Sequence, residues 1–285
     1  MSILSVKGLH KRYEKFHLND VSFSLDKGYI MGFIGINGAG KTTTLKSMLN
    51  IVNADSGEVE ILGKDFKEHE MELKREIGYM FGGIDYYPKK SIKTITDVVK
   101  RFYPNWDTET YLKYCKRFKI DQDKKVFELS DGMKVKYSLA LALSHNARLF
   151  ILDEPTSGLD PAARDNLLEL FQELVEDGER SILFSTHITS DLEKCADYIT
   201  YINEGKIIAS TTKDDFIGAY KIVKGGNEQL DPELQNKFIA LKSNDYGFSG
   251  LIKTSDLTTT GNLTIDLPNL EDIMIYYAKK EYDNE

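Results

Sequence analysis

One segment of the chain fills every position of a phosphate-binding loop. Residues 35–43 read Gly-Ile-Asn-Gly-Ala-Gly-Lys-Thr-Thr, which matches the pattern G-x-x-x-x-G-K-[ST]. The pattern requires a buried strand before the loop, and the apolar run from Tyr29 to Ile34 predicts one. Glycine lets the backbone turn tightly, so that successive N–H groups and a helix N-terminus point at an anion. The chain is therefore predicted to bind a nucleotide, and a Gly-rich turn without a ligand is the weaker alternative.

The residues of this loop have distinct predicted roles. Lys41 would reach the β- and γ-phosphates of a nucleoside triphosphate, and Thr42 would offer its hydroxyl to Mg²⁺. The other candidate nucleotide-binding residues of the loop are Asn37, Gly38, Gly40 and Thr43.

A second segment predicts the residues that act on the nucleotide. Residues 149–154 read Leu-Phe-Ile-Leu-Asp-Glu, a pattern typical of a buried strand that brings two carboxylates to the edge of a sheet where α/β proteins bind ligands. Asp153 is predicted to hold Mg²⁺ through water, and Glu154 to orient or deprotonate the attacking water. Taken alone, such a strand more often simply meets solvent, so these roles depend on the phosphate loop.

Three further motifs lie around this strand in a fixed order. They are Leu129-Ser130-Asp131-Gly132-Met133 before it, Ser157-Gly158-Leu159-Asp160 after it, and Ser185-Thr186-His187 at the end of the next apolar run. With these motifs, residues 1–215 resemble the ATP-binding subunits of ABC transporters, which carry a phosphate loop, signature, acidic strand, D-loop and switch histidine in this order. The sequence has no Asn-Lys-x-Asp motif of the kind by which GTPases read their base.

The resemblance implies that two copies of the chain enclose two ATP molecules. Each ATP would be held by the Lys41 loop of one copy and by the signature of the other, where Ser130 and the Gly132 backbone would cap the γ-phosphate. An isolated copy would then bind ATP but hydrolyse it poorly.

The resemblance also implies roles for three residues outside the loop and the signature. His187 would contact the γ-phosphate and the water held by Glu154, Asp160 would cross the interface between the copies, and Tyr13 matches the aromatic residue that stacks on adenine. Each has a simpler alternative, because Asp160 before Pro161 is a good helix N-cap, and a lone Tyr or His at a strand end more often only packs. The two roles of Asp160 are compatible.

Two regions depart from the family pattern. The signature of most members reads Leu-Ser-Gly-Gly-Gln, whereas this chain has Asp131 and Met133 at the third and fifth positions. An acid beside a triphosphate is unfavourable unless a cation meets it, and we expect Lys134 or Lys136 to do so. Where most members carry a glutamine that touches Mg²⁺ and the attacking water, this chain has Gly82.

The missing glutamine weakens the expected link between the nucleotide and a membrane partner. The alternative is that Asp85 or a water molecule takes the place of the glutamine. The charge of Asp131 in the signature predicts modest rather than abolished turnover. The aromatic residues Tyr86, Tyr87 and Phe102 are the predicted docking surface for that partner, and burial in the helical region is the alternative.

The net charge and the apolar content of the chain limit the classes of partner that we expect it to bind. A net charge of −8 and a pI near 5.3 give no electrostatic case for nucleic acid. The longest uncharged stretch contains the phosphate loop and is shorter than the ~18 residues of a membrane span, and no secretion signal is expected at the start. Two distant cysteines fit a reducing compartment, and Mg²⁺ arriving with ATP is the one metal expected. We predict a cytoplasmic chain bound to the inner face of the cell membrane through a separately encoded permease.

The order of predicted elements indicates an α/β fold. Residues 3–36 are rich in strand patterns, residues 93–145 in helical patterns, and strands resume near 149, 181, 198 and 206 with helices between them. We predict an ABC-type nucleotide-binding domain over residues 1–215, in which a phosphate-loop ATPase core carries an antiparallel β subdomain and a helical subdomain at about 88–145.

Residues 216–285 predict a small α+β appendage. Short strands are expected at 237–241, 248–252 and 263–267. A closing helix follows, and its expected apolar face consists of Leu270, Ile273, Met274 and Tyr277.

Similar C-terminal segments occur in the single-ATPase exporters of drugs and antimicrobial peptides of the ABC-2 type. This likeness and the segment from Phe102 to Asp107 favour export. The predicted function is an ATP-hydrolysing subunit, working as a homodimer, whose nucleotide-driven closure powers export of a drug, peptide or other amphipathic substrate. The alternatives are a soluble regulatory or assembly ATPase, which uses closure to hold another protein, and a nucleotide sensor with low turnover.

Overall fold

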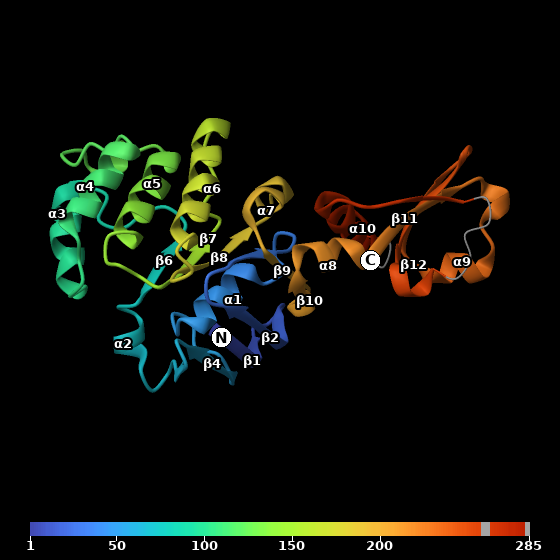
Figure 1. Cartoon of the computed structure of the whole chain (residues 1–285), viewed down its shortest axis with the longest axis horizontal. Coiled ribbons are helices and arrows are strands. Elements are labelled where there is room, and N and C mark those ends of the chain that lie inside the picture. The colour runs from blue at the N-terminus through green and yellow to red at the C-terminus, as the bar shows by residue number, and fades with distance from the viewer. Residues whose placement is uncertain (258–262, 283–285) are drawn as a thin grey trace. The chain divides into compact units, whose positions relative to one another are not determined.

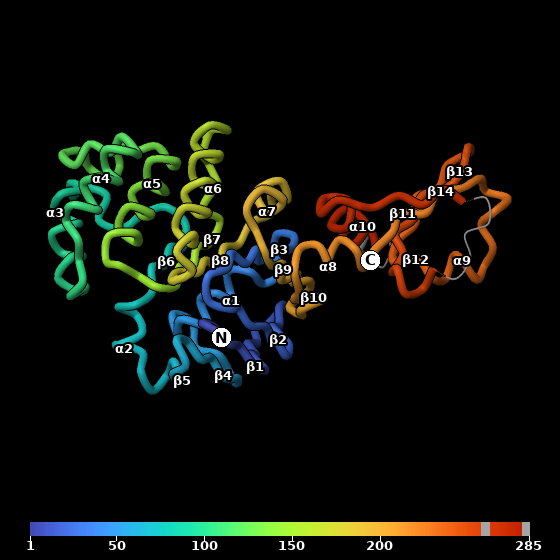
Figure 2. The backbone as a smooth tube through the Cα atoms, in the orientation of Figure 1, coloured from blue at the N-terminus to red at the C-terminus, as the bar shows by residue number. Residues whose placement is uncertain are grey.

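The computed structural model describes residues 1–257 and 263–282 of the chain (Figure 1). The chain divides into two compact units, of which the first comprises Met1–His187 and Lys194–Ser210 and the second comprises Ile188–Glu193 and Thr211–Glu285. Figure 2 follows the backbone through both units.

The first unit contains an antiparallel sheet in the order β2-β1-β4-β5. Its strands are β1 (Ser2–Arg12), β2 (His17–Asp26), β4 (Ser56–Ile61) and β5 (Lys64–Asp65). Along β2, Val21, Phe23 and Leu25 are buried and their polar neighbours are not, which is the alternation of a strand with one buried face. Leu62, which follows β4, has a left-handed φ of 55° and lies beyond the end of the strand.

The second sheet of this unit carries the phosphate loop. Its order is β10-β9-β3-β8-β7-β6, from strands β3 (Ile30–Ile34), β6 (Ile77–Phe81), β7 (Leu149–Asp153), β8 (Ser181–Thr186), β9 (Tyr198–Asn203) and β10 (Lys206–Thr212). Parallel pairing joins β9, β3, β8, β7 and β6 in that order. Strands β3, β7 and β8 are buried along their whole length, which explains their continuous apolar sequences. Because they are parallel, their carboxyl ends meet at one edge.

The first unit also contains helices α1 (Lys41–Met48), α2 (Glu70–Leu73), α3 (Ile92–Val99), α4 (Thr108–Arg117), α5 (Asp131–Ala142) and α6 (Pro161–Val175), with 3₁₀ turns at Lys100–Phe102 and Val126–Glu128. Most of helix α7 (Thr189–Cys195) belongs to the second unit. Helices α3, α4 and α5 gather at one end of the unit, as predicted for the helical region (Figure 1). Inside this group the Thr96 hydroxyl lies 2.9 Å from the hydroxyls of both Tyr111 and Tyr137 and joins all three helices.

One apolar core joins the two sheets of the first unit. Phe23 of β2 and Phe33 of β3 pack with ring centroids 5.3 Å apart, and Leu45 and Met48 of α1 belong to the same buried cluster. The antiparallel sheet thereby fixes the helix that starts at the phosphate loop.

The second unit is an antiparallel sheet in the order β12-β13-β11-β14. It contains β11 (Tyr220–Gly225), β12 (Phe238–Asn244), β13 (Gly247–Lys253) and β14 (Thr264–Asp266), helices α8 (Lys213–Gly218), α9 (Pro232–Lys237) and α10 (Leu270–Tyr282), and 3₁₀ turns at Asn227–Gln229 and Thr254–Asp256. Helix α10 packs against β12 and β13. Its buried face includes Tyr276, whose hydroxyl lies 2.7 Å from that of Ser249, whereas the predicted Met274 is only half-buried.

Within the described residues, no helix is both long and apolar enough to cross a membrane.

His145 is a buried titratable residue of the helical region. Its ring is 1% exposed and stacks on Tyr103 with centroids 3.9 Å apart, and its Nδ1 has no hydrogen-bond partner among the described residues. Burial disfavours the charged ring and lowers the pKa of His145 to about 4.

We expect this histidine to make the first unit less stable in acid. Because its folded pKa lies below its unfolded value, the stabilisation is complete above the unfolded pKa and is lost as the pH falls from about 6.5 toward 4. Between pH 7 and 5 the loss should be about 2 kcal/mol, and His145→Gln should remove it. Urea unfolding followed by the fluorescence of Trp106, the single tryptophan, measures this difference. An equal acid sensitivity in the variant would contradict the assignment.

Candidate nucleotide site

The loop between β3 and α1 has a backbone that only glycine permits. Gly38 and Gly40 have φ values of 85° and 111°. A Cβ on Gly40 would lie 2.7 Å from the Phe16 ring, whereas a Cβ on Gly38 would have nothing within 4 Å. The loop therefore packs tightly on its inner side and leaves an open outer side, which fits a phosphate cradle at the N-terminus of α1.

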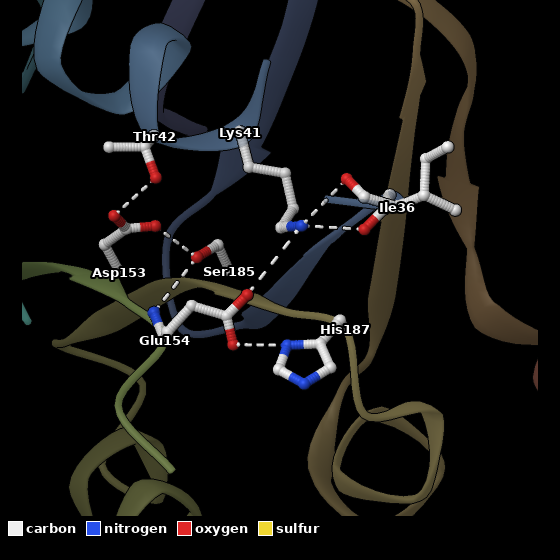
Figure 3. Close-up of polar contacts among 8 residues, drawn as sticks. Ile36, Lys41, Thr42, Asp153, Glu154, Ser185 and His187 are labelled. Atoms are coloured by element: carbon white, nitrogen blue, oxygen red, sulfur yellow. Dashed lines mark hydrogen bonds and ion pairs between the residues drawn. The ribbon is translucent and has the colours of Figure 1, made fainter. Parts of the chain in front are cut away.

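Lys41 lies under this loop. Its side chain is 6% exposed, and its Nζ donates to the carbonyl oxygens of Gly35 at 2.7 Å and Ile36 at 3.2 Å (Figure 3). The same Nζ is 3.7 Å from Glu154 Oε1. Burial lowers the pKa of Lys41, and the carboxylates of Glu154 and Asp153 partly oppose that effect. A cation held in this way is ready to exchange its carboxylate partner for a phosphate.

Asp153 connects the loop to the neighbouring strand. Its Oδ2 accepts a hydrogen bond from the Thr42 hydroxyl at 2.7 Å, and its Oδ1 accepts one from the Ser185 hydroxyl at 2.5 Å (Figure 3). Hydroxyl and carboxylate oxygens are the ligands that suit Mg²⁺, so the donor set of Thr42 and Asp153 fits this ion.

Ser185 belongs to the Ser185-Thr186-His187 motif, but no role was predicted for its side chain. Besides donating to Asp153, its Oγ accepts a hydrogen bond from the Glu154 N–H at 3.0 Å. The sequence signal that could have indicated its role is its polar side chain within the apolar run that forms β8. Its meaning depends on the pairing of Asp153 with Ser185, which the sequence does not reveal.

Glu154 has an unusual backbone conformation. Its φ is 51°, in the left-handed region that non-glycine residues seldom adopt. Its Oε2 lies 2.9 Å from His187 Nδ1, while its other oxygen faces Lys41 (Figure 3). The strained turn thus directs a carboxylate back over the sheet edge, between a lysine and a histidine.

Signature and D-loop residues form a second group. Ser130 caps α5 and accepts a hydrogen bond from the Met133 N–H, so this helix begins at Asp131. Asp160 caps α6 as predicted, and the Ala163 N–H holds its pKa below the usual range. Gly132 packs so closely on the D-loop that a Cβ would lie 2.8 Å from the Gly158 carbonyl oxygen.

Asn37 borders a depression beside the loop. This depression has a volume of about 560 Å³, and its lining residues are Lys15, Phe16, His17, Asn19, Ile36, Asn37, Gly38, Ala39, Glu204 and Lys206. The half-exposed Tyr13 is connected to this wall by its N–H, which donates to the Phe16 carbonyl at 2.8 Å. Thr43 follows on the first turn of α1 and is half-buried.

The predicted docking residues are exposed, so the alternative of burial is wrong. Tyr86, Tyr87 and Phe102 are 50%, 67% and 68% exposed. Tyr86 and Phe102 line a groove of about 820 Å³ that also includes Gly82 and Asp85. The Asp85 carboxylate, the alternative to the missing glutamine, is 91% exposed and lies 3.8 Å from Lys134 Nζ.

Several known proteins are similar in sequence to this chain. A family model described as "ABC transporter" matches residues 18–157. ABC transporter ATP-binding protein YtrB of Bacillus subtilis (strain 168) is 35% identical over 190 residues, or 67% of this chain and 65% of YtrB, so the chain spans slightly less than two thirds of that relative. Nod factor export ATP-binding protein I of Burkholderia orbicola (strain AU 1054) is 33% identical over 72% of this chain and 69% of that protein. Bacitracin transport ATP-binding protein BcrA of Bacillus licheniformis is 29% identical over 86% of this chain and 80% of BcrA.

Solved structures share the fold. An ATP-binding subunit of an ABC transporter superposes with a TM-score of 0.68 at 28% identity, over 75% of this chain and 91% of that chain. A dimeric ATP-binding cassette in a post-hydrolysis state with ADP and phosphate superposes with a TM-score of 0.66 at 20% identity. The match covers 73% of this chain and 98% of that chain. The predicted phosphate-loop α/β fold is confirmed.

We expect Ser185→Ala to destabilise the first unit. The substitution leaves the Asp153 carboxylate, which is 7% exposed, without one of its two donors, and such a loss costs about 1–3 kcal/mol. Ser24→Ala, on an exposed position of β2, is the matched control and should change little. Urea unfolding compares the variants, and equal stability of both would contradict the role given to Ser185.

Proposed function

Because the chain belongs to the family of ABC transporter ATP-binding proteins, we propose that it binds and hydrolyses ATP to power export through a membrane partner. Two relatives are named for the export of Nod factor and the transport of bacitracin, which supports an amphipathic substrate. Their membrane partners would carry substrate specificity.

The observation that carries the proposal is the network of Lys41, Thr42, Asp153, Glu154 and His187 at one sheet edge. Lys41 exchanges Glu154 for phosphate oxygens and neutralises their charge. Glu154 then orients the attacking water and accepts its proton, while His187 holds the second carboxylate oxygen. Mg²⁺ at Thr42 and Asp153 would draw charge from the phosphate oxygens.

Three of the remaining candidate residues would complete the ATP site of a facing copy. Ser130, Gly132 and Asp160 belong to a group whose members are exposed or half-buried, so a second copy can reach them. In this proposal Ser130 and the Gly132 backbone cap the γ-phosphate bound to the facing copy, and Asp160 crosses between the copies. A dimeric cassette of the same fold supports this arrangement.

Within one copy, Tyr13 holds the base, and Asn37, Gly38, Gly40 and Thr43 hold the phosphates.

The partner of the groove is a separately encoded permease. The groove joins aromatic side chains, including Tyr86 and Phe102, to the cations Lys74, Arg75 and Arg101, which suits a helix with apolar and acidic residues. The chain would then act at the cytoplasmic face of the cell membrane, and dimer closure would drive the permease between two states.

One observation favours a second candidate. Gly82 has no side chain to touch a nucleotide, and Asp85 is engaged by Lys134. A regulatory ATPase, or a sensor with low turnover, would need neither contact.

We expect turnover per chain to rise with protein concentration, because a complete site needs two copies. Glu154→Gln should keep ATP binding and lower turnover by at least about 100-fold, since it removes the general base. Glu169→Gln, on an exposed position of α6, is the matched control. Steady-state phosphate release provides the measurement.

Constant turnover at all concentrations would rule out the shared site. ATP binding without hydrolysis at any concentration would favour the sensor.

We expect Phe102→Ala to weaken binding of the proposed permease by about tenfold or more, because aromatic anchors dominate interfaces. Tyr246→Ala, which removes a 95% exposed aromatic side chain of the second unit, should leave binding unchanged. Co-purification of the two proteins after joint expression measures the effect, and equal recovery of both variants would place the docking surface elsewhere.

A further inference from the structure

Three charged side chains connect the signature to the loop after β6. Lys134 Nζ lies 3.2 Å from Asp131 Oδ1, on the first turn of α5, and 3.8 Å from Asp85 Oδ1. The lysine side chain is 21% exposed, whereas the two carboxylates are 90% and 91% exposed. A single partly buried cation therefore holds two acids at the surface.

The backbone of the loop fixes this arrangement. A Cβ on Gly83 would lie 2.7 Å from Lys134 Cβ and 3.1 Å from the Val135 backbone nitrogen. Only glycine allows the loop to approach α5 so closely, and this contact keeps Asp85 within reach of Lys134.

Asp131 creates the need for this cation. As the first residue of α5 it stabilises the helix N-terminus. It also adds a negative charge between Ser130 and Gly132, the two residues proposed to face a triphosphate on a second copy. Like charges repel, so an unneutralised Asp131 would oppose closure of the two copies around ATP.

We propose that Lys134 is a positioning residue that neutralises Asp131 and holds the 82–86 loop on the signature helix, so that two copies can close around ATP. The inference rests on the proposed function. Since Gly82, Gly83, Ile84, Asp85 and Tyr86 line the groove, the same lysine connects the signature to the partner-binding surface. This connection runs through α5 and does not need the missing glutamine.

An ordinary surface ion pair would behave differently. Exposed pairs contribute little to folding stability, so loss of Lys134 should leave the stability nearly unchanged. The neutralising role instead predicts a defect in ATP-dependent dimer formation that disappears when Asp131 also loses its charge.

The test uses the full chain carrying Glu154→Gln, which accumulates the closed dimer. Sedimentation velocity measures the ATP concentration that gives half-maximal dimer. Adding Lys134→Met should raise this concentration about three- to tenfold, and Lys134→Arg should restore it. Adding Asp131→Asn to Lys134→Met should remove most of the defect, and 0.5 M salt should shrink it because exposed charges are screened.

The outcomes separate this inference from the proposed function. If the parent Glu154→Gln chain forms no dimer with ATP, the shared site and this inference both fail. If the parent dimerises and Lys134→Met dimerises equally well, only this inference is overturned. A defect that persists with Asp131→Asn would also overturn it, because the lysine would then act through packing. Thermal unfolding of each variant confirms that it is folded.

Discussion

The site depends on one buried carboxylate. Asp153 ends β7 and accepts hydrogen bonds from Thr42, which begins α1, and from Ser185 of β8. These bonds hold together three segments that are far apart in the sequence. Because Ser185 also receives the Glu154 N–H, the same contacts support the strained turn that directs Glu154 toward Lys41 and His187. A charge buried at this edge is tolerated because donors satisfy it.

In the proposed account, the chemistry is divided between two groups of residues. Lys41 and His187 each contact Glu154 within one chain, whereas Ser130 and Asp160 cap their own helices. Helix caps leave the outer face of each side chain available for a second copy. The division explains how ATP binding and assembly of two copies can be one event in the proposed account.

The sequence predicted most of the fold because its signals are local. The phosphate loop, the buried runs of β3, β7 and β8, and the cap at Asp160 each depend on a few consecutive residues. The cap at Ser130 was not predicted. The role of Ser185 could not be predicted, since it arises from strand pairing across many residues. The engagement of Asp85 by Lys134 was missed for the same reason, as it depends on how closely Gly83 approaches α5. The exposure of Tyr86 and Phe102 could not be predicted either, because it depends on how the surrounding helices pack.

The central claim is that a complete ATP site is made by two copies, and mixing two inactive variants tests it most directly. Lys41→Ala removes the phosphate-loop lysine and keeps the signature, whereas Ser130→Arg blocks the signature and keeps the loop. In a mixed dimer, one of the two sites combines the intact loop of one copy with the intact signature of the other. The account predicts that neither variant hydrolyses ATP alone and that the mixture regains up to about a quarter of the native turnover, since about half of the dimers are mixed. No recovery in the mixture, with dimers formed, would contradict the shared site.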